Sequence, residues 1–220
     1  MPRPTFLALA DEKRDRVVAA AVAEFARHSY GAASLDRVAF AAEVSKGSLY
    51  QYFADKQDLY GWLVTVHLPA EKRKTQSASS PSPASDFFGW LAASFHAGLR
   101  QFRDEPLLAA LAARAASPAS DPEVAAVHGR LRALTHDGLC ALIRGAKKNA
   151  DVRRDVPDDL AAELVGTLMG TALVARMARR VGVTPEAFLA EPARAHTLAA
   201  GDVRALVDDA VVVLRRALAP

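Results

Sequence analysis

The chain has 220 residues, of which 51% are hydrophobic and 24% are charged, and its net charge is +3. This length and apolar content suit one medium-sized domain, or a small domain joined to a larger one, with a sizeable core. The weak positive charge neither demonstrates nor excludes a nucleic-acid partner, because a local basic patch is sufficient for phosphate contacts.

A disulfide framework and a membrane span are both excluded by the sequence pattern. Cys140 is the single cysteine, which fits a reducing cytoplasm. The longest apolar stretch, Val165 to Ala175, is interrupted by two glycines and is shorter than the ~20 residues that cross a bilayer. We therefore expect a soluble, cytoplasmic protein without a membrane partner.

Apolar residues recur at helical spacing along almost the whole chain, and no run of strict alternation predicts a strand, so we expect an all-α fold. The first helix is predicted from about Asp11 to His28. A short second helix is predicted from an N-cap at Ser34 to Ala41. The turn Ala42 to Ser45 leads into a third helix, and Asp55 is predicted to cap a fourth.

Residues beyond this region predict a larger helical unit. Thr75 to Ser85 is a low-complexity Ser/Pro/Ala stretch, interpreted as a hinge between domains or as a disordered surface loop. Four longer helices follow, marked by apolar residues at intervals of three and four: Phe88 to Phe102 (ending before Pro106), Val127 to Leu142 (beginning after Asp121-Pro122), Leu160 to Ala175, and Leu206 to Leu218. We expect two domains, residues 1–60 and residues 61–220, with the flexible segment at 75–85.

The third helix, Ser45 to Phe53, carries the chemistry. Leu49 and Phe53 share one face and are expected to pack inward. The other sides carry groups suited to phosphates and base edges: Ser45, Lys46, Ser48, Tyr50, Gln51 and Tyr52. Two short helices with a tight turn, the second polar and exposed, are typical of a helix-turn-helix that reads the DNA major groove. The alternative is a surface helix of an ordinary helical domain.

Several of these side chains have expected roles on DNA. Lys46 and Gln51 are candidate donors to bases or phosphates, and the hydroxyls of Tyr50, Tyr52 and Ser34 are candidate donors to phosphate oxygens. Lys56 lies in the first turn of the fourth helix, where its charge opposes the helix dipole. A phosphate nearby would explain that position.

The segment Val38 to Leu59 reads VAFAAEVSKGSLYQYFADKQDL and resembles the N-terminal motif of the TetR-type family of bacterial transcriptional regulators. The resemblance covers about Lys13 to Leu63. It implies DNA contacts from Ser48, Tyr50, Tyr52 and Lys56, from Lys46, Gly47 and Gln51 nearer the bases, and from Ser34 and Arg37 on the preceding helix. Glu43 departs from the family's usual glycine in the turn, so its backbone must avoid a positive φ or tolerate one at a cost.

The same resemblance implies that the larger domain dimerises and holds a small effector. The helices from Leu160 and from Asp202 are the expected dimer-forming pair; the alternative is that they only complete the core of one subunit. An apolar or amphipathic effector is expected, because these helices carry no dense charged cluster. Its candidate contacts are Trp62, Trp90, Phe95, His96, Phe102, Thr135 and Met169, and the alternative for each is ordinary core packing.

No catalytic, metal or cofactor site is expected. The sequence has no glycine-rich phosphate loop, no nucleophile elbow and no zinc-protease histidine pair. His136 and Cys140 lie one helical turn apart, but isolated residues of this kind are usually structural. We expect a homodimeric repressor that binds a palindromic operator and is released by an effector. The alternatives are an activator, a ligand-independent regulator, and a small-molecule binding or sequestering protein with a degenerate DNA-binding head.

Overall fold

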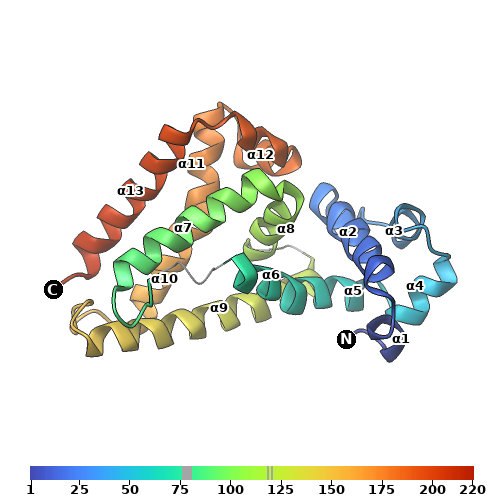
Figure 1. Ribbon diagram of the computed structural model, residues 1–220, viewed down its shortest axis with the longest axis horizontal. Helices are drawn as coiled ribbons and strands as arrows, with labels where there is room; N and C mark the ends of the chain where they lie inside the picture. The colour runs from blue at the N-terminus through green and yellow to red at the C-terminus, as the bar shows by residue number, and fades with distance from the viewer. Residues whose placement is uncertain (76–80, 118, 120) are drawn as a thin grey trace.

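The computed structural model describes residues 1–75, 81–117, 119 and 121–220, and every regular element in these ranges is helical (Figure 1). The all-α prediction is confirmed. In chain order the elements are α1 (Pro4–Leu7), α2 (Asp11–Arg27), α3 (Leu35–Ala41), α4 (Lys46–Tyr52), α5 (Lys56–Trp62), the π-helical segment η1 (Leu63–His67), α6 (Leu68–Thr75), α7 (Phe87–Asp104), α8 (Pro106–Ala116), α9 (Pro122–Lys148), α10 (Asp158–Met169), α11 (Thr171–Val181), α12 (Pro185–Ala190), the 3-10 segment η2 (Pro192–Thr197) and α13 (Ala200–Leu218).

The N-terminal head comprises α1 to α5, and side-chain caps begin three of its short helices, α3, α4 and α5. The Ser34 hydroxyl accepts a hydrogen bond from the backbone N–H of Asp36, and the Asp55 carboxylate accepts one from that of Asp58 at 2.7 Å. Both predicted caps are therefore confirmed. Ser45 caps α4 in the same way, accepting from the N–H of Ser48 at 3.0 Å. Each cap satisfies a backbone donor that the first turn of a helix leaves free.

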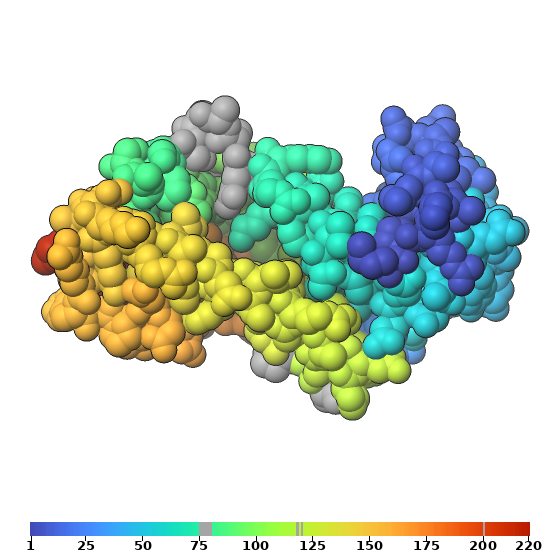
Figure 2. Space-filling model, turned by 90° about the horizontal axis from the view of Figure 1, so that it is seen from below, coloured from blue at the N-terminus to red at the C-terminus, as the bar shows by residue number. Residues whose placement is uncertain are grey.

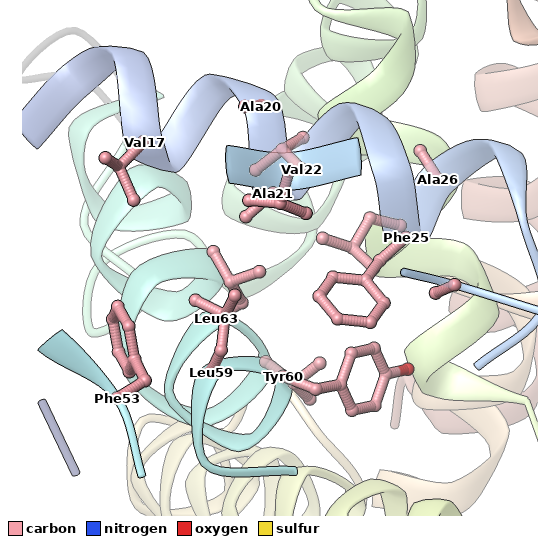
Figure 3. Packing of buried hydrophobic residues seen from close by; sticks show 14 of the residues in the cluster. Val17, Ala20, Ala21, Val22, Phe25, Ala26, Phe53, Leu59, Tyr60 and Leu63 are labelled. Atoms are coloured by element: carbon pink, nitrogen blue, oxygen red, sulfur yellow. The ribbon is translucent and has the colours of Figure 1, made fainter. Parts of the chain in front are cut away.

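One apolar cluster holds the head together (Figure 3). Val17 and Phe25 on α2 point toward Leu59 and Leu63, all of them buried. The rings of Phe25 and Tyr60 pack with centroids 4.9 Å apart. Since α2 and α5 meet along this face, α3 and α4 are held on the outside of the head.

The head is joined to the larger domain by one uninterrupted helical rod. α5, η1 and α6 follow each other without a break, so the predicted boundary at residue 60 falls inside a helix. The space-filling view shows the head as a lobe at one end of the molecule, with α9 running along the visible face (Figure 2). The predicted hinge lies partly at residues 76–80, which are outside the described residues, while Ser82 to Ser85 form a turn before α7.

The larger domain has its own apolar core, contributed mainly by α7, α9, α10, α11 and α13. α9 begins as predicted, with Asp121 accepting hydrogen bonds from the N–H groups of Glu123 and Val124 and with Pro122 in the first turn. Neighbours in the core include α9 beside α10, and α7 beside α13.

One sequence prediction about this domain is wrong. The single helix expected from Leu160 to Ala175 is two helices, α10 and α11, which separate at Gly170. The backbone approaches itself closely there, since a Cβ on Gly170 would lie 3.0 Å from the carbonyl oxygen of Gly166. The predicted end of a helix before Pro106 is confirmed, because α7 ends at Asp104. Pro106 is also the first residue of α8, which was not predicted, at a position where its missing N–H costs nothing.

The stretch Asp158–Val181 is long and apolar enough to cross a membrane by length and composition alone. It is interrupted at Gly170 and lies against α9 and α13. Core helices of globular domains pass the same test, so this property does not argue for a membrane partner.

Candidate nucleic-acid interface and internal cavity

The outer face of α4 carries the predicted polar groups. Lys46, Gly47 and Gln51 are exposed, and Tyr50 is 41% exposed. Leu49 is only 1% exposed, as its inward role requires. The Ser48 hydroxyl is half-buried and lies 2.8 Å from that of Ser45. α4 therefore presents the Lys46 ammonium, the Gln51 amide and the Tyr50 phenol to solvent, while its apolar face is buried.

The ammonium of Lys46 is held beside α3 by the Asp36 carboxylate, at an Nζ–Oδ1 distance of 2.8 Å. This hydrogen bond keeps the pKa of Lys46 above its ordinary value, so the side chain is charged at neutral pH. Both residues are exposed, and exposed pairs of this kind are weak. A phosphate can therefore take the place of Asp36.

Arg37 is engaged inside the head. Its guanidinium donates to the carboxylate of Glu24, with Nε–Oε1 at 3.0 Å, and to the carbonyl of Ala32 at 2.6 Å. Glu24 is 8% exposed and also accepts from the Ser34 N–H at 2.8 Å. Burial alone raises the pKa of Glu24, but the hydrogen bonds from Arg37 and Ser34 outweigh it and leave that pKa below its ordinary value. Arg37 is 52% exposed, so one side of it still faces solvent.

Lys56 has partners within the protein that the sequence did not reveal. Its ammonium donates to the carbonyls of Tyr30 at 2.8 Å and Ala33 at 3.2 Å, and lies 4.5 Å from the centre of the Tyr30 ring. Its position against the helix dipole is therefore explained by the loop between α2 and α3, without a phosphate. A contact between Lys56 and DNA stays a prediction.

Tyr52 was expected on the exposed side of α4, and this is wrong. The residue is only 5% exposed, and its ring packs at 6.0 Å from that of Phe6. The cause is α1, which no pattern in the sequence predicted. The backbone N–H of Arg3 donates to the Tyr52 carbonyl, and the Thr5 hydroxyl to that of Gln51, so α1 covers the end of α4.

Glu43 takes the positive φ that its position in the turn requires, at 56°. The turn is closed by the hydrogen bond from the Val44 N–H to the Ala39 carbonyl at 3.0 Å. Near this turn Phe40 is 88% exposed, which sequence reasoning missed. The available signal was its place off the face that carries Val38, the buried residue of α3.

The larger domain contains a partly open cavity of about 300 Å³ between α6, α7, α8, α9, α10 and α11. Five of the predicted effector contacts line it together: Trp90, Phe95, Phe102, Thr135 and Met169. Thr135 donates its hydroxyl hydrogen bond to the Leu131 carbonyl at 3.0 Å, so its donor is already used within the helix.

Trp62 and His96 do not line this cavity. Trp62 belongs to the core of the head, with its ring 5.2 Å from Phe6 and 5.6 Å from Phe53. His96 follows Phe95 directly, so the helix turns its side chain about 100° away from the Phe95 direction. The structure therefore does not bring these two side chains together with the other five.

A wider crevice of about 790 Å³ separates the head from the larger domain. Ala113 and Val174 line both the crevice and the cavity. Arg114, next to Ala113 on α8, donates to the carbonyl of Ala26 in α2 at 3.2 Å and to that of Leu189 in α12 at 3.3 Å. α8 therefore contacts both the cavity and the helix on which the head is built.

A buried hydrogen bond also joins the two parts of the molecule. The Tyr60 hydroxyl lies 2.7 Å from Nε2 of His128, and Nδ1 of His128 lies 2.8 Å from the Ser117 carbonyl. Burial lowers the pKa of His128, which favours the neutral ring that such a pair requires. The Cys140 sulfur lies 3.5 Å from His136 Nε2, and the described residues contain no group of three potential ligands that could hold a metal ion.

Known proteins resemble the head most clearly. The family model described as "Bacterial regulatory proteins, tetR family" matches residues 17–61. The HTH-type transcriptional repressor SCO4008 of Streptomyces coelicolor is 36% identical over 77 residues, and the uncharacterized HTH-type transcriptional regulator YhgD of Bacillus subtilis is 32% identical over 71 residues. These matches cover 34% and 32% of this chain, and each spans 37% of the relative's own length.

A solved structure resembles the whole chain. It is that of a TetR family transcriptional regulator from Chloroflexus aurantiacus, with a TM-score of 0.70 and 28% sequence identity. The match covers 99% of this chain and 98% of that one, so the larger domain shares its architecture as well as the head.

Proposed function

We propose that this chain, whose head matches the tetR family of bacterial regulatory proteins, is a cytoplasmic one-component repressor, which binds a palindromic operator as a homodimer and is released by a small effector. The proteins that the chain resembles are transcriptional regulators and not enzymes. The observation that carries the proposal is the exposed polar face of α4, which is built over the buried Leu49 and capped by Ser45.

DNA contacts are assigned to the residues that α3 and α4 leave accessible. Gly47 and Gln51 face the bases, Lys46 meets a base edge or a phosphate, and Ser45, Ser48, Tyr50 and Ser34 serve the phosphates. Arg37 contributes through its exposed side while remaining paired to Glu24. For Tyr52 and Lys56, which have partners inside the head, we propose support of the reading helix as the main role.

Dimerisation is assigned to α10 and α13. These neighbouring helices carry large apolar side chains that one subunit leaves uncovered: Leu160 is 56% exposed, Val212 is 46% exposed and Val213 is 52% exposed. A second copy would remove these side chains from water. Two heads on a two-fold axis would then face half-sites about one DNA turn apart, or a multiple of it.

Release is assigned to an effector in the cavity. Occupancy of the cavity would move α8, and Arg114 on α8 holds the Ala26 carbonyl at the end of α2. An effector shifts the equilibrium only if it binds the DNA-free arrangement more tightly than the DNA-bound one.

A salt titration of affinity for an operator-like duplex, repeated with two variants, tests the DNA contacts. Wild-type affinity should fall steeply as salt rises, because phosphate contacts release counterions. Lys46→Met should weaken binding and reduce the salt slope by about one if its ammonium meets a phosphate. Gln51→Ala should change base preference instead. A nearly salt-independent affinity would favour the alternative of a small-molecule binding protein with a degenerate head, for which the strained Glu43 is the structural hint.

A further inference from the structure

The C-terminal end of α4 is covered by α1, and this contact fixes the position of Arg3. α1 lies beside α4 at the end of the head (Figure 1). The backbone N–H of Arg3 donates to the Tyr52 carbonyl at 2.9 Å. Phe6, three residues further along, is buried and packs against the rings of Tyr52 and Phe53. A hydrogen bond and an apolar anchor therefore hold Arg3 at the end of α4.

The side chain of Arg3 is exposed, and its guanidinium makes no hydrogen bond or ion pair with any residue that the structure describes. Arg3 differs in this respect from Arg37 and Lys56, two expected DNA ligands whose cationic groups are engaged within the head. A guanidinium carries five N–H donors in a planar fork that matches the geometry of a phosphate. Arg3 can place these donors on DNA without breaking a contact inside the protein.

The end of α4 where Arg3 lies is the end at which DNA needs a cation. The C-terminal end of a helix carries partial negative charge from its free carbonyls, and this charge repels phosphates. α1 occupies two of these carbonyls, since the Thr5 hydroxyl donates to that of Gln51 and the Arg3 N–H to that of Tyr52. The Arg3 guanidinium adds a full positive charge at the same place. α1 thus makes this end of α4 attractive to a phosphate.

The length of α4 fits contacts at both of its ends. α4 has seven residues and is about 10 Å long, close to the major-groove width of about 12 Å. A helix of this length in the groove has its two ends near the phosphates that border the groove. Ser45 and Lys46 lie at the N-terminal end of α4. At the other end Tyr52, an expected phosphate ligand, is buried, whereas Arg3 is exposed.

We infer that the Arg3 guanidinium binds a phosphate of the operator beside the C-terminal end of α4, and that α1 holds it in position to do so. The inference rests on the proposed binding of α4 in the major groove. Because phosphates carry no base identity, the contact adds affinity on every DNA sequence that the head binds and leaves base preference unchanged.

Salt titrations of affinity for an operator-like duplex test the charge of Arg3. Arg3→Met should weaken binding and reduce the slope of log affinity against log salt by about one, because one phosphate contact is lost. Arg3→Lys should retain most of that slope, since it keeps the charge. Both variants keep the backbone N–H that binds the Tyr52 carbonyl, and their thermal unfolding shows whether the head remains folded.

Arg27→Met is the matched control. Arg27 is exposed and has no partner among the described residues, as is the case for Arg3. It follows Ala26, whose carbonyl binds Arg114 of the larger domain, so it lies at the end of α2 nearest that domain. Its loss removes the same charge and should leave the salt slope unchanged. A wild-type slope in Arg3→Met, or equal losses of slope in Arg3→Met and Arg27→Met, would overturn the inference.

Duplexes in which one phosphate at a time is replaced by an uncharged methylphosphonate locate the contact. Neutralising the phosphate that Arg3 binds should weaken binding of the wild-type protein but not weaken binding of Arg3→Met any further. The other sensitive phosphates should keep their effect in the variant. An identical set of sensitive phosphates in the wild-type protein and in folded Arg3→Met would refute the contact.

Failure of the proposed function has a different signature. If the wild-type protein shows no salt-dependent affinity for DNA, the DNA-binding head and the Arg3 contact both fail. If the wild-type affinity falls steeply with salt and Arg3→Met behaves in the same way, the DNA-binding head stands and only the role of Arg3 fails.

Discussion

Lys56 illustrates how a single residue can satisfy a family motif for a structural reason. Its ammonium closes the loop between α2 and α3 by meeting the carbonyls of Tyr30 and Ala33. Lys56→Met should lower the free energy of unfolding by about 1–3 kcal/mol, because two carbonyls lose their charged donor. Chemical denaturation measures this change.

Lys46→Met is the matched control for that experiment, since the exposed Lys46 pairs with Asp36 alone among the residues that the structure describes. It should leave stability nearly unchanged and weaken DNA binding. If instead Lys56→Met leaves stability unchanged and reduces only the salt slope of DNA binding, Lys56 is a phosphate ligand after all.

Protonation of Glu24 at acid pH should destabilise the head. Its pKa in the folded protein lies below the ordinary value of 4.5, so its contribution is fully present above about pH 4.5 and is lost as the pH falls through the folded pKa. Glu24→Gln should lower Tm at neutral pH by about 2–4 °C for each kcal/mol lost. It should also flatten the fall of Tm below pH 4.5. An equally steep acid transition in the variant would show that other carboxylates dominate it.

Which polar side chains α4 exposes to solvent could be predicted from the sequence, whereas the contacts that hold α4 in place could not. Lys46, Tyr50 and Gln51 were recognisable because their neighbours Leu49 and Phe53 set the buried face. The burial of Tyr52 depends on α1, and the engagement of Lys56 depends on the loop before α3. Both are tertiary contacts that no local spacing encodes.

The turn between α3 and α4 is the element where sequence and backbone conflict. Glu43 has a φ of 56°, which a residue with a Cβ adopts at a cost of roughly 1–2 kcal/mol. Glu43→Gly should therefore stabilise the head by about 1 kcal/mol, reduced by glycine's greater freedom in the unfolded chain.

Glu43→Asn is the companion variant, because asparagine tolerates this conformation better than glutamate and removes the same charge. Thermal unfolding of both variants measures the gain in stability. Destabilisation by both would mean that the Glu43 side chain stabilises the turn by more than the strain costs.

Helical periodicity in the sequence predicted which helices exist, whereas the residues at which they end depend on packing. α2, α3 and α13 match strong apolar repeats with clear caps or breaks. The break at Gly170 could not be predicted in this way, because the apolar pattern continues through it. It becomes visible only in the structure, where the backbone of Gly170 approaches the Gly166 carbonyl closely. α8 is rich in alanine, and its pattern beyond Pro106 was too weak to predict a helix.

For the whole molecule, the proposed dimer can be tested separately from DNA binding. Leu160→Glu combined with Val213→Glu should convert the dimer to a monomer, because charge would be buried in the subunit interface. Native mass spectrometry measures the assembly.

Leu134 on α9 is 60% exposed and lies outside the proposed interface, so Leu134→Glu is the matched control and should leave the dimer intact. A dimer that survives the double substitution would place the interface elsewhere. A wild-type monomer would remove the two-headed model altogether.

We propose that two copies of α4 read two halves of one DNA site. Selection of bound duplexes from a random DNA library by the wild-type protein, with Gln51→Ala in parallel, tests this directly. We expect an enriched inverted repeat whose half-sites lie about 10–10.5 base pairs apart, or a multiple of that, with altered bases within each half-site for Gln51→Ala. Enrichment of a single unrepeated site, or of no sequence at all, would contradict it.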